Sequence, residues 1–340
     1  MSGVSGDFSR AAVLGGAGFI GSHLCDALLD VGTQVVCVDN FCTGRQANIA
    51  HLVDSPGFTL VEHDVTDPLP DLGPLDVVFH LASAASPDAY HRLPIETLRA
   101  GSLGTEHGLQ LAERYEARFV LASTSEVYGD PERHPQTEDY VGHVNPIGPR
   151  SVYDEAKRFA EAMTFAYARS RGVRVGVARI FNTYGPRMQP DDGRMVPNFI
   201  TQALAEQPCT VTGTGNQTRS ICYVSDTVAG LFSLAYSSEP GPINLGNPVE
   251  LTVLEIASLV AEIIGSHAGI RHLPAVEDDP QRRCPDITRA VQRLDWRPFV
   301  QLAEGLKQTI AWFTSELSAP QRAIALLDAD KSARGEPNHL

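Results

Sequence analysis

The chain has 340 residues, of which 43% are hydrophobic, and a formal net charge of -14. That size and composition suffice to bury a large core in one large domain or two closely joined ones. The negative charge argues against a broad nucleic-acid or anionic-membrane surface, since phosphate recognition needs clustered Lys and Arg. No apolar run approaches the roughly 20 residues of a membrane-spanning helix. We therefore expect a globular protein without nucleic-acid or membrane partners.

Six cysteines show neither a CxxC pair nor the spacing of zinc ligands. No charged-then-apolar leader begins the chain. We expect reduced thiols, a cytoplasmic location and no bound metal.

The first motif is a glycine-rich stretch, residues 15–21, between an apolar run and a helix-like segment. Gly15 permits a tight turn, Gly18 lets the backbone approach a pyrophosphate, and Gly21 lets helix and strand pack closely. Three glycines alone would also fit a flexible surface turn. Their position between a strand and a helix predicts a dinucleotide site.

A second apolar run ends at Asp39. Its carboxylate can accept hydrogen bonds from an adenosine ribose and would repel the extra phosphate of NADP. Arg45 follows closely and would tolerate that phosphate, which leaves NADP as the alternative. We expect the cofactor to be NAD.

Further along the chain, apolar runs alternate with helix-like stretches, which predicts an α/β fold with a Rossmann-like, doubly wound parallel sheet. The candidate strands are residues 11–14, 34–38, 59–63, 77–81, 119–122 and 174–180. Beyond Asn182 the connections are rich in Pro and Gly, and helices are expected at 195–206 and 251–264. This change predicts a smaller α/β substrate-binding lobe.

We expect residues 1–182 to form mainly the NAD-binding domain, with 223–250 returning to it. Residues 183–222 and 251–318 would form mainly the substrate-binding lobe, and 319–340 a C-terminal extension.

A helix-like segment begins with Tyr153 and Lys157, which the i,i+4 spacing places on one face. A free phenol titrates near 10, so a tyrosine base working near neutral pH needs a shift of about three units. Lys157 and an oxidised nicotinamide would supply the positive charge for that shift. An exposed Tyr and a solvated Lys at ordinary helical spacing are the alternative.

Polar residues follow the strand at 119–122, at the sheet edge where ligands usually bind. Thr124 could donate a hydrogen bond to a developing oxyanion, Ser125 could orient a carboxylate, and Glu126 could handle protons or water. A Ser/Thr-rich loop with a solvated Glu is the alternative.

These residues carry a family resemblance. Segments 15–21, 39–40, 80–83 and 153–157 resemble the extended short-chain dehydrogenase/reductase family, which acts on nucleotide sugars. Segments 123–131, 143–150, 179–188 and 278–283 are similar to the UDP-glucuronate decarboxylase branch of that family. The resemblance extends from about residue 10 to residue 315.

The resemblance implies a closed redox cycle on UDP-glucuronic acid. Tyr153 would take the proton of the sugar 4-hydroxyl while hydride passes to NAD. The resulting ketone, which is β to the carboxylate, would accept the electrons released by loss of carbon dioxide. The same NADH would then reduce the ketone and give UDP-xylose.

The resemblance also assigns roles to individual residues. It implies a catalytic set of Tyr153, Lys157, Thr124, Ser125, Glu126 and Arg283, with Arg283 beside the sugar carboxylate. On the cofactor side it places Gly15, Gly18, Phe19, Ile20, Gly21, Asp39, Asn40, Thr43, Gly44, Asp64, Val65, Leu81, Ser83, Tyr153, Lys157, Thr183, Gln189 and Arg194. On the substrate side it places Tyr90, Arg99, Asn182, Val196, Phe199, Arg219 and Arg283.

Three positions depart from the family pattern. Gly101 stands where many members have Asn, Thr212 where many have Tyr near the nucleotide base, and Ser83 replaces a usual proline-containing pattern. Without the resemblance, Arg283 would be a surface arginine of a charged loop.

Other activities share the first oxidation. They are release of a UDP-4-keto-pentose with NADH, 4-epimerisation and 4,6-dehydration. A non-catalytic nucleotide-sensing protein is an alternative of another class, but it would not need Tyr153, Lys157, Thr124 and Glu126 together.

The resemblance also favours a homodimer. Apolar or small residues of the 153–171 helix could pack on a second copy, or else on their own sheet: Phe159, Ala160, Met163, Ala166 and Tyr167.

Overall fold

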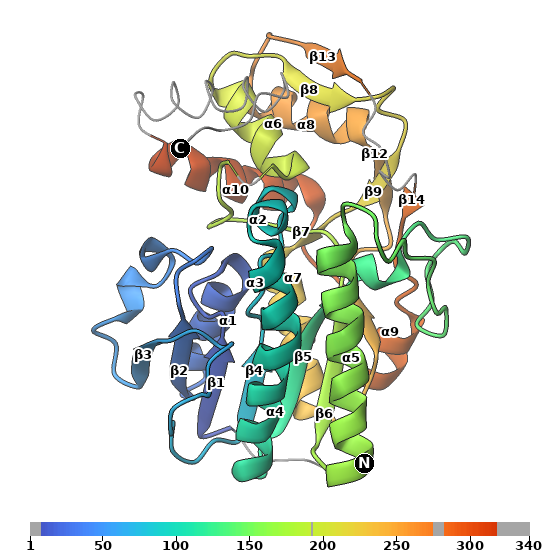
Figure 1. The fold of residues 1–340 in the computed structure, drawn as a ribbon. Helices are drawn as coiled ribbons and strands as arrows, with labels where there is room; N and C mark the ends of the chain where they lie inside the picture. Colours follow the sequence, from blue (N-terminus) through green and yellow to red (C-terminus); the bar gives the residue numbers. More distant parts are fainter. Residues whose placement is uncertain (1–7, 192, 275–281, 318–340) are drawn as a thin grey trace.

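The computed structural model describes residues 8–191, 193–274 and 282–317. A seven-stranded parallel sheet forms the larger part, in the order β11-β6-β5-β4-β1-β2-β3 (Figure 1). Its strands are β1 (Arg10–Leu14), β2 (Gln34–Asp39), β3 (Phe58–Glu62), β4 (Val77–His80), β5 (Arg118–Thr124), β6 (Val175–Ile180) and β11 (Ile243–Leu245).

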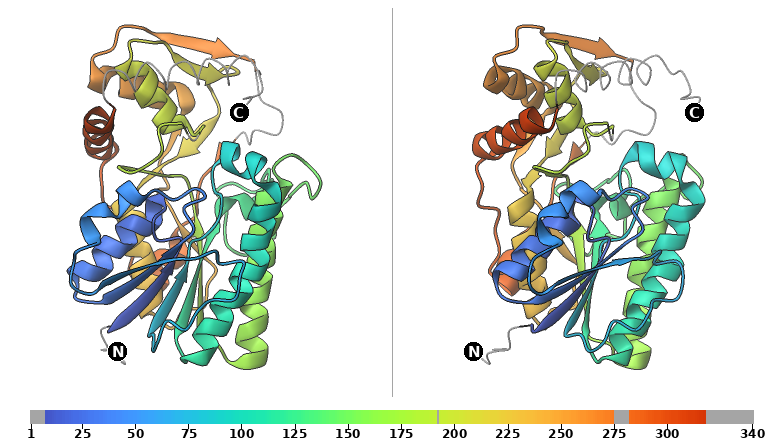
Figure 2. Two further views of the ribbon diagram at one scale, coloured as in Figure 1. Left: turned by 60° about the vertical axis from the view of Figure 1, so that its left-hand side comes forward. Right: turned by 90° about the vertical axis from the view of Figure 1, so that its left-hand side faces the viewer.

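Helices cover both faces of this sheet, because its central strands are apolar on both sides (Figure 2). In β1, Ala11 and Val13 belong to the core under α1 and α7, whereas Ala12 and Leu14 belong to the core under α4 and α5. This alternation follows from the two-residue period of a strand. The helices of this part are α1 (Phe19–Asp30), α2 (Pro87–Arg92), α3 (Pro94–Arg99), α4 (Thr105–Arg114), α5 (Ser151–Arg171), α7 (Val224–Tyr236) and α9 (Thr288–Leu294).

A smaller α/β part lies beyond the carboxyl ends of the strands, at the top of Figure 1. It contains a parallel pair, β13 with β8, and a three-stranded sheet in the order β12-β9-β14. Its elements are α6 (Met195–Leu204), β8 (Cys209–Thr212), β9 (Thr218–Ser220), β12 (Glu250–Thr252), α8 (Val253–Ile264), β13 (Ile270–Leu273), β14 (Arg282–Arg283) and α10 (Leu302–Glu316). The short pair of β7 (Thr183–Tyr184) and β10 (Cys222–Tyr223) joins the two parts. Three short 3-10 turns (Gln46–Asn48, Ala50–Leu52 and Ser125–Tyr128) and a π-helical turn (Ala100–Gly104) complete the described elements.

The doubly wound parallel sheet predicted from the sequence is confirmed. The six predicted strands begin and end within one residue of the observed ones, except that β5 continues two residues further to Thr124. The prediction missed β11, a three-residue strand at the edge of the sheet. The exact division between domain and lobe stays a prediction, and the expected extension 319–340 lies outside the described residues.

The helix expected at 251–264 begins later, at Val253, because residues 250–252 form β12. Thr252 fixes this start with a capping box: its hydroxyl accepts the amide of Glu255, and the Glu255 carboxylate accepts the amide of Thr252. None of the described helices is long and apolar enough to span a bilayer. All six cysteines lie in the described part and are free thiols.

Candidate active site

The glycine turn between β1 and α1 leaves room only for backbone. Gly15 has φ +83°, and a Cβ there would lie 2.6 Å from the backbone nitrogen of Ala82. A Cβ on Gly21 would collide with the carbonyl oxygen of Gly15. Gly18 is the N-cap of α1, and the first amides of any helix have no carbonyl partner within that helix. The turn therefore fits the predicted pyrophosphate of a dinucleotide.

Asp39 holds this turn in place from the end of β2. Its Oδ2 accepts a 2.9 Å hydrogen bond from the amide of Ala17, and its Oδ1 accepts one of 2.9 Å from the amide of Phe41. Burial raises the pKa of Asp39, and the two hydrogen bonds act in the opposite direction. Each carboxylate oxygen keeps a second lone pair, so these bonds leave acceptors for the predicted ribose contact.

Four more of the predicted cofactor residues form contacts that order the same edge of the sheet. The side-chain amide of Asn40 donates to the Asp64 carboxylate over 2.8 Å. The side-chain amide of Gln189 donates to the backbone carbonyl of Thr43 over 2.6 Å. The Gln189 bond links the segment after β7 to the loop after β2.

An unsatisfied polar atom lies on the same side. The hydroxyl of Ser83 is buried and has no hydrogen-bond partner among the described residues. This free hydroxyl is compatible with the cofactor contact predicted for Ser83. Arg194, the residue before α6, has its guanidinium 5.8 Å from the centre of the ring of Phe19, which begins α1. The other predicted cofactor residues are buried or half-buried: Ile20, Gly44, Val65, Leu81 and Thr183.

Tyr153 and Lys157 lie in the first turns of α5, and both side chains are buried. The ammonium group of Lys157 donates to the carbonyl of Ala122 over 2.9 Å and lies 5.9 Å from the centre of the Tyr153 ring. The exposed pair that was the alternative is therefore wrong. Burial lowers the pKa of Lys157 to about 8, which leaves the group largely charged at neutral pH.

The protein groups around Tyr153 do not lower its pKa as the sequence interpretation requires. Burial raises the pKa of Tyr153, against a smaller opposing effect from the hydrogen bond with Thr124. A phenolate therefore needs additional positive charge, which an oxidised nicotinamide would bring.

Thr124 ends β5 and caps the 3-10 turn Ser125–Tyr128 by accepting the amide of Glu126 over 3.3 Å. The turn directs Ser125 and Glu126 inward, and both are largely inaccessible. The alternative of a solvated loop is wrong, because the strand continues two residues beyond its predicted end and places these side chains below the surface.

Glu126 forms ion pairs with two arginines, one on each carboxylate oxygen. Oε1 contacts the guanidinium of Arg283, and Oε2 contacts that of Arg150. Arg283 is 3% exposed and also donates to the carbonyl of Gly129 over 3.0 Å. Burial raises the pKa of Glu126, but the charges of Arg283 and Arg150 outweigh it and hold the pKa at about 2. We call Glu126, Arg150 and Arg283 the Glu126 cluster.

Arg283 reaches this position because it belongs to a strand, not to the charged surface loop that was the alternative. β14 pairs in parallel with β9, and the register sets Arg283 opposite Arg219. Arg283 and Arg219, both predicted for the substrate side, thus lie on neighbouring strands. The preceding segment of that motif, up to Gln281, lies outside the described residues.

A second buried ion pair lies behind the catalytic helix. Arg179 of β6 donates from Nε and Nη2 to the two carboxylate oxygens of Glu161 over 2.9 and 2.7 Å. The hydroxyl of Ser123 donates to Glu161 Oε1 over 2.6 Å. This Glu161–Arg179 pair locks α5 to the carboxyl ends of β5 and β6, and so positions Tyr153 and Lys157.

The predicted substrate residues differ in their position relative to the catalytic residues. Tyr90 is buried, and its ring stacks on that of Tyr153 with centroids 5.4 Å apart. Val196 and Phe199 lie in α6 with their side chains buried in the hydrophobic core. Arg99 ends α3 on the exposed surface, and the carbonyl of Asn182 accepts the amide of Cys222 over 2.8 Å. The structure therefore brings Tyr90 to the catalytic residues but does not do so for Arg99.

Gly101, the departure from the family pattern, lies in the π-helical turn Ala100–Gly104. A Cβ there would lie 2.7 Å from the Cβ of Ala156 in α5. The absence of a side chain thus lets this turn approach the catalytic helix closely.

Sequence interpretation missed Arg150, Arg179 and Glu161 as parts of the site. Arg150 and Arg179 both lie in segments that carry the resemblance, so those segments contained the signal. Their pairing depends on contacts between distant segments, which spacing does not show.

One group of potential metal ligands occurs in the described residues: His134, Glu250 and Cys284, with ligand atoms within 4.8 Å of one another. The imidazole and carboxylate already pair over 2.9 Å, and Thr218 donates to the same carboxylate over 2.6 Å. The guanidinium of Arg282 lies 3.9 Å from it. These contacts balance the charge of the Glu250 carboxylate without a metal ion.

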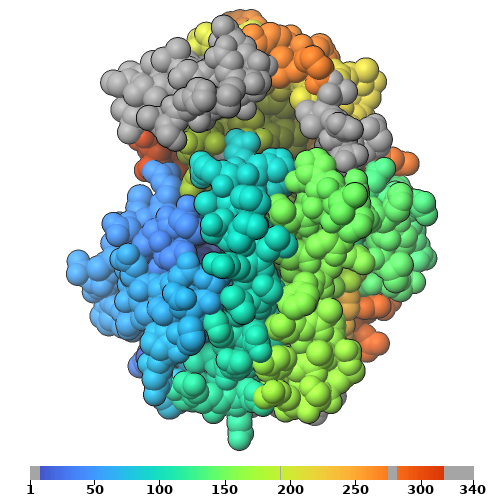
Figure 3. Space-filling model, in the orientation of Figure 1, coloured from blue at the N-terminus to red at the C-terminus, as the bar shows by residue number. Residues whose placement is uncertain are grey.

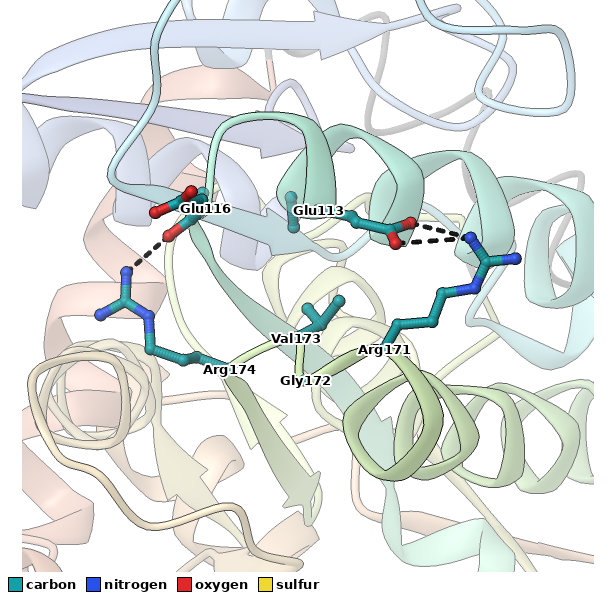
Figure 4. Close-up of a pocket in the computed structure, with 8 residues that line it drawn as sticks. Glu113, Glu116, Arg171, Gly172, Val173 and Arg174 are labelled. Carbon is teal, nitrogen blue, oxygen red and sulfur yellow. Dashed lines mark hydrogen bonds and ion pairs between the residues drawn. The ribbon is translucent and has the colours of Figure 1, made fainter.

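A surface pocket of about 340 Å³ lies at the opposite end of the sheet, where β5 and β6 begin (Figure 4). Its rim carries an ion pair between Arg171 and Glu113 and a 2.7 Å hydrogen bond from Arg174 to the carbonyl of Glu116. In α/β sheets of this type ligands bind at the carboxyl ends of the strands. The pocket is therefore separate from the candidate active site.

The fold and the site define a nucleotide-dependent enzyme of the doubly wound α/β class. Residues 11–246 match the model of the NAD dependent epimerase/dehydratase family, and the chain belongs to that family. A UDP-glucuronic acid decarboxylase 1 from Danio rerio is 52% identical over 335 residues, which cover 98% of this chain and 80% of the relative.

Solved structures agree with this assignment. A UDP-glucose 4-epimerase from Thermotoga maritima, with UDP-glucose, is 29% identical, has a TM-score of 0.84, and aligns over 91% of this chain and 100% of its own. A UDP-glucuronic acid 4-epimerase variant from Bacillus cereus, in complex with UDP-4-deoxy-4-fluoro-glucuronic acid and NAD, is 28% identical, with a TM-score of 0.81 over 91% of this chain and 100% of its own.

Proposed function

We propose that this protein is an NAD-dependent decarboxylase that converts UDP-glucuronic acid to UDP-xylose through a UDP-4-keto intermediate. The Glu126 cluster is the observation that carries the proposal. One carboxylate shared by two largely buried guanidinium groups leaves one positive charge in excess, and a buried charge requires a partner. The carboxylate of the sugar supplies that partner. The names of the relatives support the same substrate.

The residues around the glycine turn fit NAD. Gly15, Gly18 and Gly21 would hold its pyrophosphate and Asp39 its adenosine ribose. Bound NAD supplies the acceptor, and later the donor, of the hydride at carbon 4 of the sugar. The chain supplies orientation and exclusion of water.

Tyr153 takes the proton of the sugar 4-hydroxyl in the first step. The charged ammonium of Lys157 stabilises the phenolate, and the Thr124 hydroxyl donates to the oxygen at carbon 4 as it becomes a carbonyl. The rigid helix α5, fixed by the Glu161–Arg179 pair, keeps these groups aligned.

Carbon dioxide then leaves from the carbon next to the ketone. Arg283 holds the carboxylate until the carbon–carbon bond breaks, and Glu126 fixes the orientation of Arg283. The electron pair of that bond moves into the C4 carbonyl and forms an enolate, which Thr124 stabilises. A proton then adds to the former carboxylate-bearing carbon, and the ketone is reduced in place.

The product of the purified enzyme tests this cycle. With UDP-glucuronic acid and NAD, we expect one carbon dioxide and one UDP-xylose per turnover, measured by NMR, without lasting absorbance at 340 nm. Stoichiometric NADH with a UDP-4-keto-pentose would support the alternative of early release. A 4-epimer that retains the carboxylate would contradict decarboxylation altogether.

Tyr153→Phe tests the base. The variant keeps the stacked ring but loses the phenolic oxygen, so we expect the first oxidation to fall by a factor of about 100 to 10,000. Rapid-mixing absorbance at 340 nm measures that step alone. A near-normal rate would exclude Tyr153 as the base.

We also propose that the protein is a homodimer through the face formed by α3, the π-helical turn and α5, which run side by side in Figure 3. Ala160 and Tyr167 pack into the core of their own sheet, which is the second of the two arrangements expected for this helix. Exposed apolar side chains on this face support the proposal: Ile95, Leu98, Leu103 and Phe159. Light scattering of the wild type and of Phe159→Glu measures the assembly state.

A cytoplasmic location is proposed as well. Its support is the set of six thiols, all free in the described structure, which suits a reducing compartment.

A further inference from the structure

The proposed reaction consumes one proton, which must reach the carbon that loses carbon dioxide. The source of that proton is proposed here on the basis of the proposed function. Glu126 is a poor source, because Arg150 and Arg283 occupy both of its oxygens and hold its pKa at about 2. The two guanidinium groups keep their protons at any working pH.

Asp154 is the neighbouring acid that the mechanism has not used. It follows Tyr153 in the first turns of α5, and its residue is 5% exposed. Its Oδ1 is buried and has no hydrogen-bond partner among the described residues. Arg150 lies one helical turn before it, where i and i+4 side chains meet. A buried carboxyl oxygen without a hydrogen-bond partner, next to a catalytic tyrosine, indicates a group that acts on a ligand.

A second unsatisfied atom belongs to the same place. The hydroxyl of Tyr90 is buried without a partner among the described residues, and its ring stacks on Tyr153. The charges of Arg150, Glu126, Asp154 and Arg283 all act on Tyr90. Tyr90 and Asp154, the two neighbours of Tyr153, thus each carry a buried polar atom without a hydrogen-bond partner among the described residues.

The electrostatics keep a proton on Asp154 near neutral pH. Burial and the charge of Glu126 raise the pKa of Asp154 to about 7, against the opposing effects of Arg150 and Arg283. A sugar carboxylate on Arg283 would add a negative charge and raise that pKa further. Substrate binding therefore favours the protonated acid that the reaction needs.

We propose that Asp154 is the proton donor for the carbon that loses carbon dioxide. The O–H bond of Asp154 breaks and a C–H bond forms with the electron pair that the departing carbon dioxide leaves on the enolate. Asp154 becomes a carboxylate and takes up one proton from water before the next turnover. The balance is one proton consumed for each carbon dioxide released.

Asp154→Asn tests this role, because an amide of the same shape has no acidic proton. We expect the first oxidation and carbon dioxide release in a single turnover to stay within a few-fold of wild type. We expect formation of UDP-xylose to slow by a factor of about 100 or more, with NADH absorbance persisting at 340 nm. In heavy water, wild type should place deuterium on one face of the sugar carbon, and the variant should lose that stereospecificity.

Two companion variants complete the test. Asp154→Glu should restore part of the UDP-xylose yield, because it restores an acid. Glu155→Gln is the matched control: it removes a carboxylate from the next residue, which pairs with Arg158 at 3.6 Å, and should behave as wild type.

The outcomes are distinguishable. Wild-type rate and stereospecificity in Asp154→Asn would overturn the proposal, and so would loss of the first oxidation together with the later steps, which would make Asp154 a positioning residue. Failure of the wild type to release carbon dioxide would instead refute the proposed function.

Discussion

The carboxylates of Glu161 and Glu126 lie near the catalytic helix, and both form ion pairs with arginine. The two sites differ in whether the positive and negative charges balance. Glu161 receives both donors from one arginine, Arg179, and a third hydrogen bond from Ser123, so charge and hydrogen bonds balance within the protein. Glu126 divides its two oxygens between Arg150 and Arg283, which leaves positive charge unbalanced. The first arrangement supports the fold, and the second suits a charged ligand.

The largest expected effect is on activity, which should depend on the Glu126 cluster. Arg283→Ala removes the contact proposed for the sugar carboxylate, and we expect carbon dioxide release to fall by roughly 100- to 1,000-fold. Arg282→Ala is the matched control, since its side chain is 59% exposed. Decarboxylation at the wild-type rate in Arg283→Ala would remove the distinction between the two carboxylates.

The next largest expected effect is on stability, which should depend on the Glu161–Arg179 pair. Arg179→Ala leaves Glu161 buried without its cation, and we expect the free energy of unfolding in urea to fall by about 3 to 5 kcal/mol. Arg171→Ala breaks the exposed pair with Glu113 and the contact of the guanidinium with the Tyr167 ring, and should cost less than about 2 kcal/mol. Equal losses in the two variants would show that burial of the Glu161–Arg179 pair does not matter.

The smallest effect concerns pH. The pKa of Glu126 is lower in the folded protein, about 2, than its ordinary value of 4.5. Its ion pairs therefore contribute stability fully above pH 4.5, and that contribution is lost as the pH falls toward about 2. Glu126→Gln should flatten the dependence of the urea midpoint on pH over this interval. An unchanged slope would mean that the two arginines do not hold Glu126 ionised.

The sequence predicted the sheet well because its central strands are buried on both faces and read as continuous apolar runs. It predicted Tyr153, Lys157, Thr124 and Glu126 from local spacing after a strand and along one helix.

Contacts between distant segments could not be predicted from local spacing. β14 has two residues and no periodicity, so the residues alone gave no strand that would carry Arg283 to Glu126. The same holds for Arg150, which becomes a partner of Glu126 only when the loop before α5 folds back over the end of β5. The buried state of Asp154 likewise depends on these packed elements.

The affinity for a sugar with and without its carboxylate tests most directly whether the Glu126 cluster is a carboxylate receptor. In the Tyr153→Phe background, where turnover is suppressed, calorimetry with UDP-glucuronic acid and UDP-glucose isolates that contact. We predict that UDP-glucuronic acid binds about 10- to 100-fold more tightly, and that Arg283→Ala abolishes this difference. Equal affinities for the two sugars before the Arg283 substitution would contradict the account.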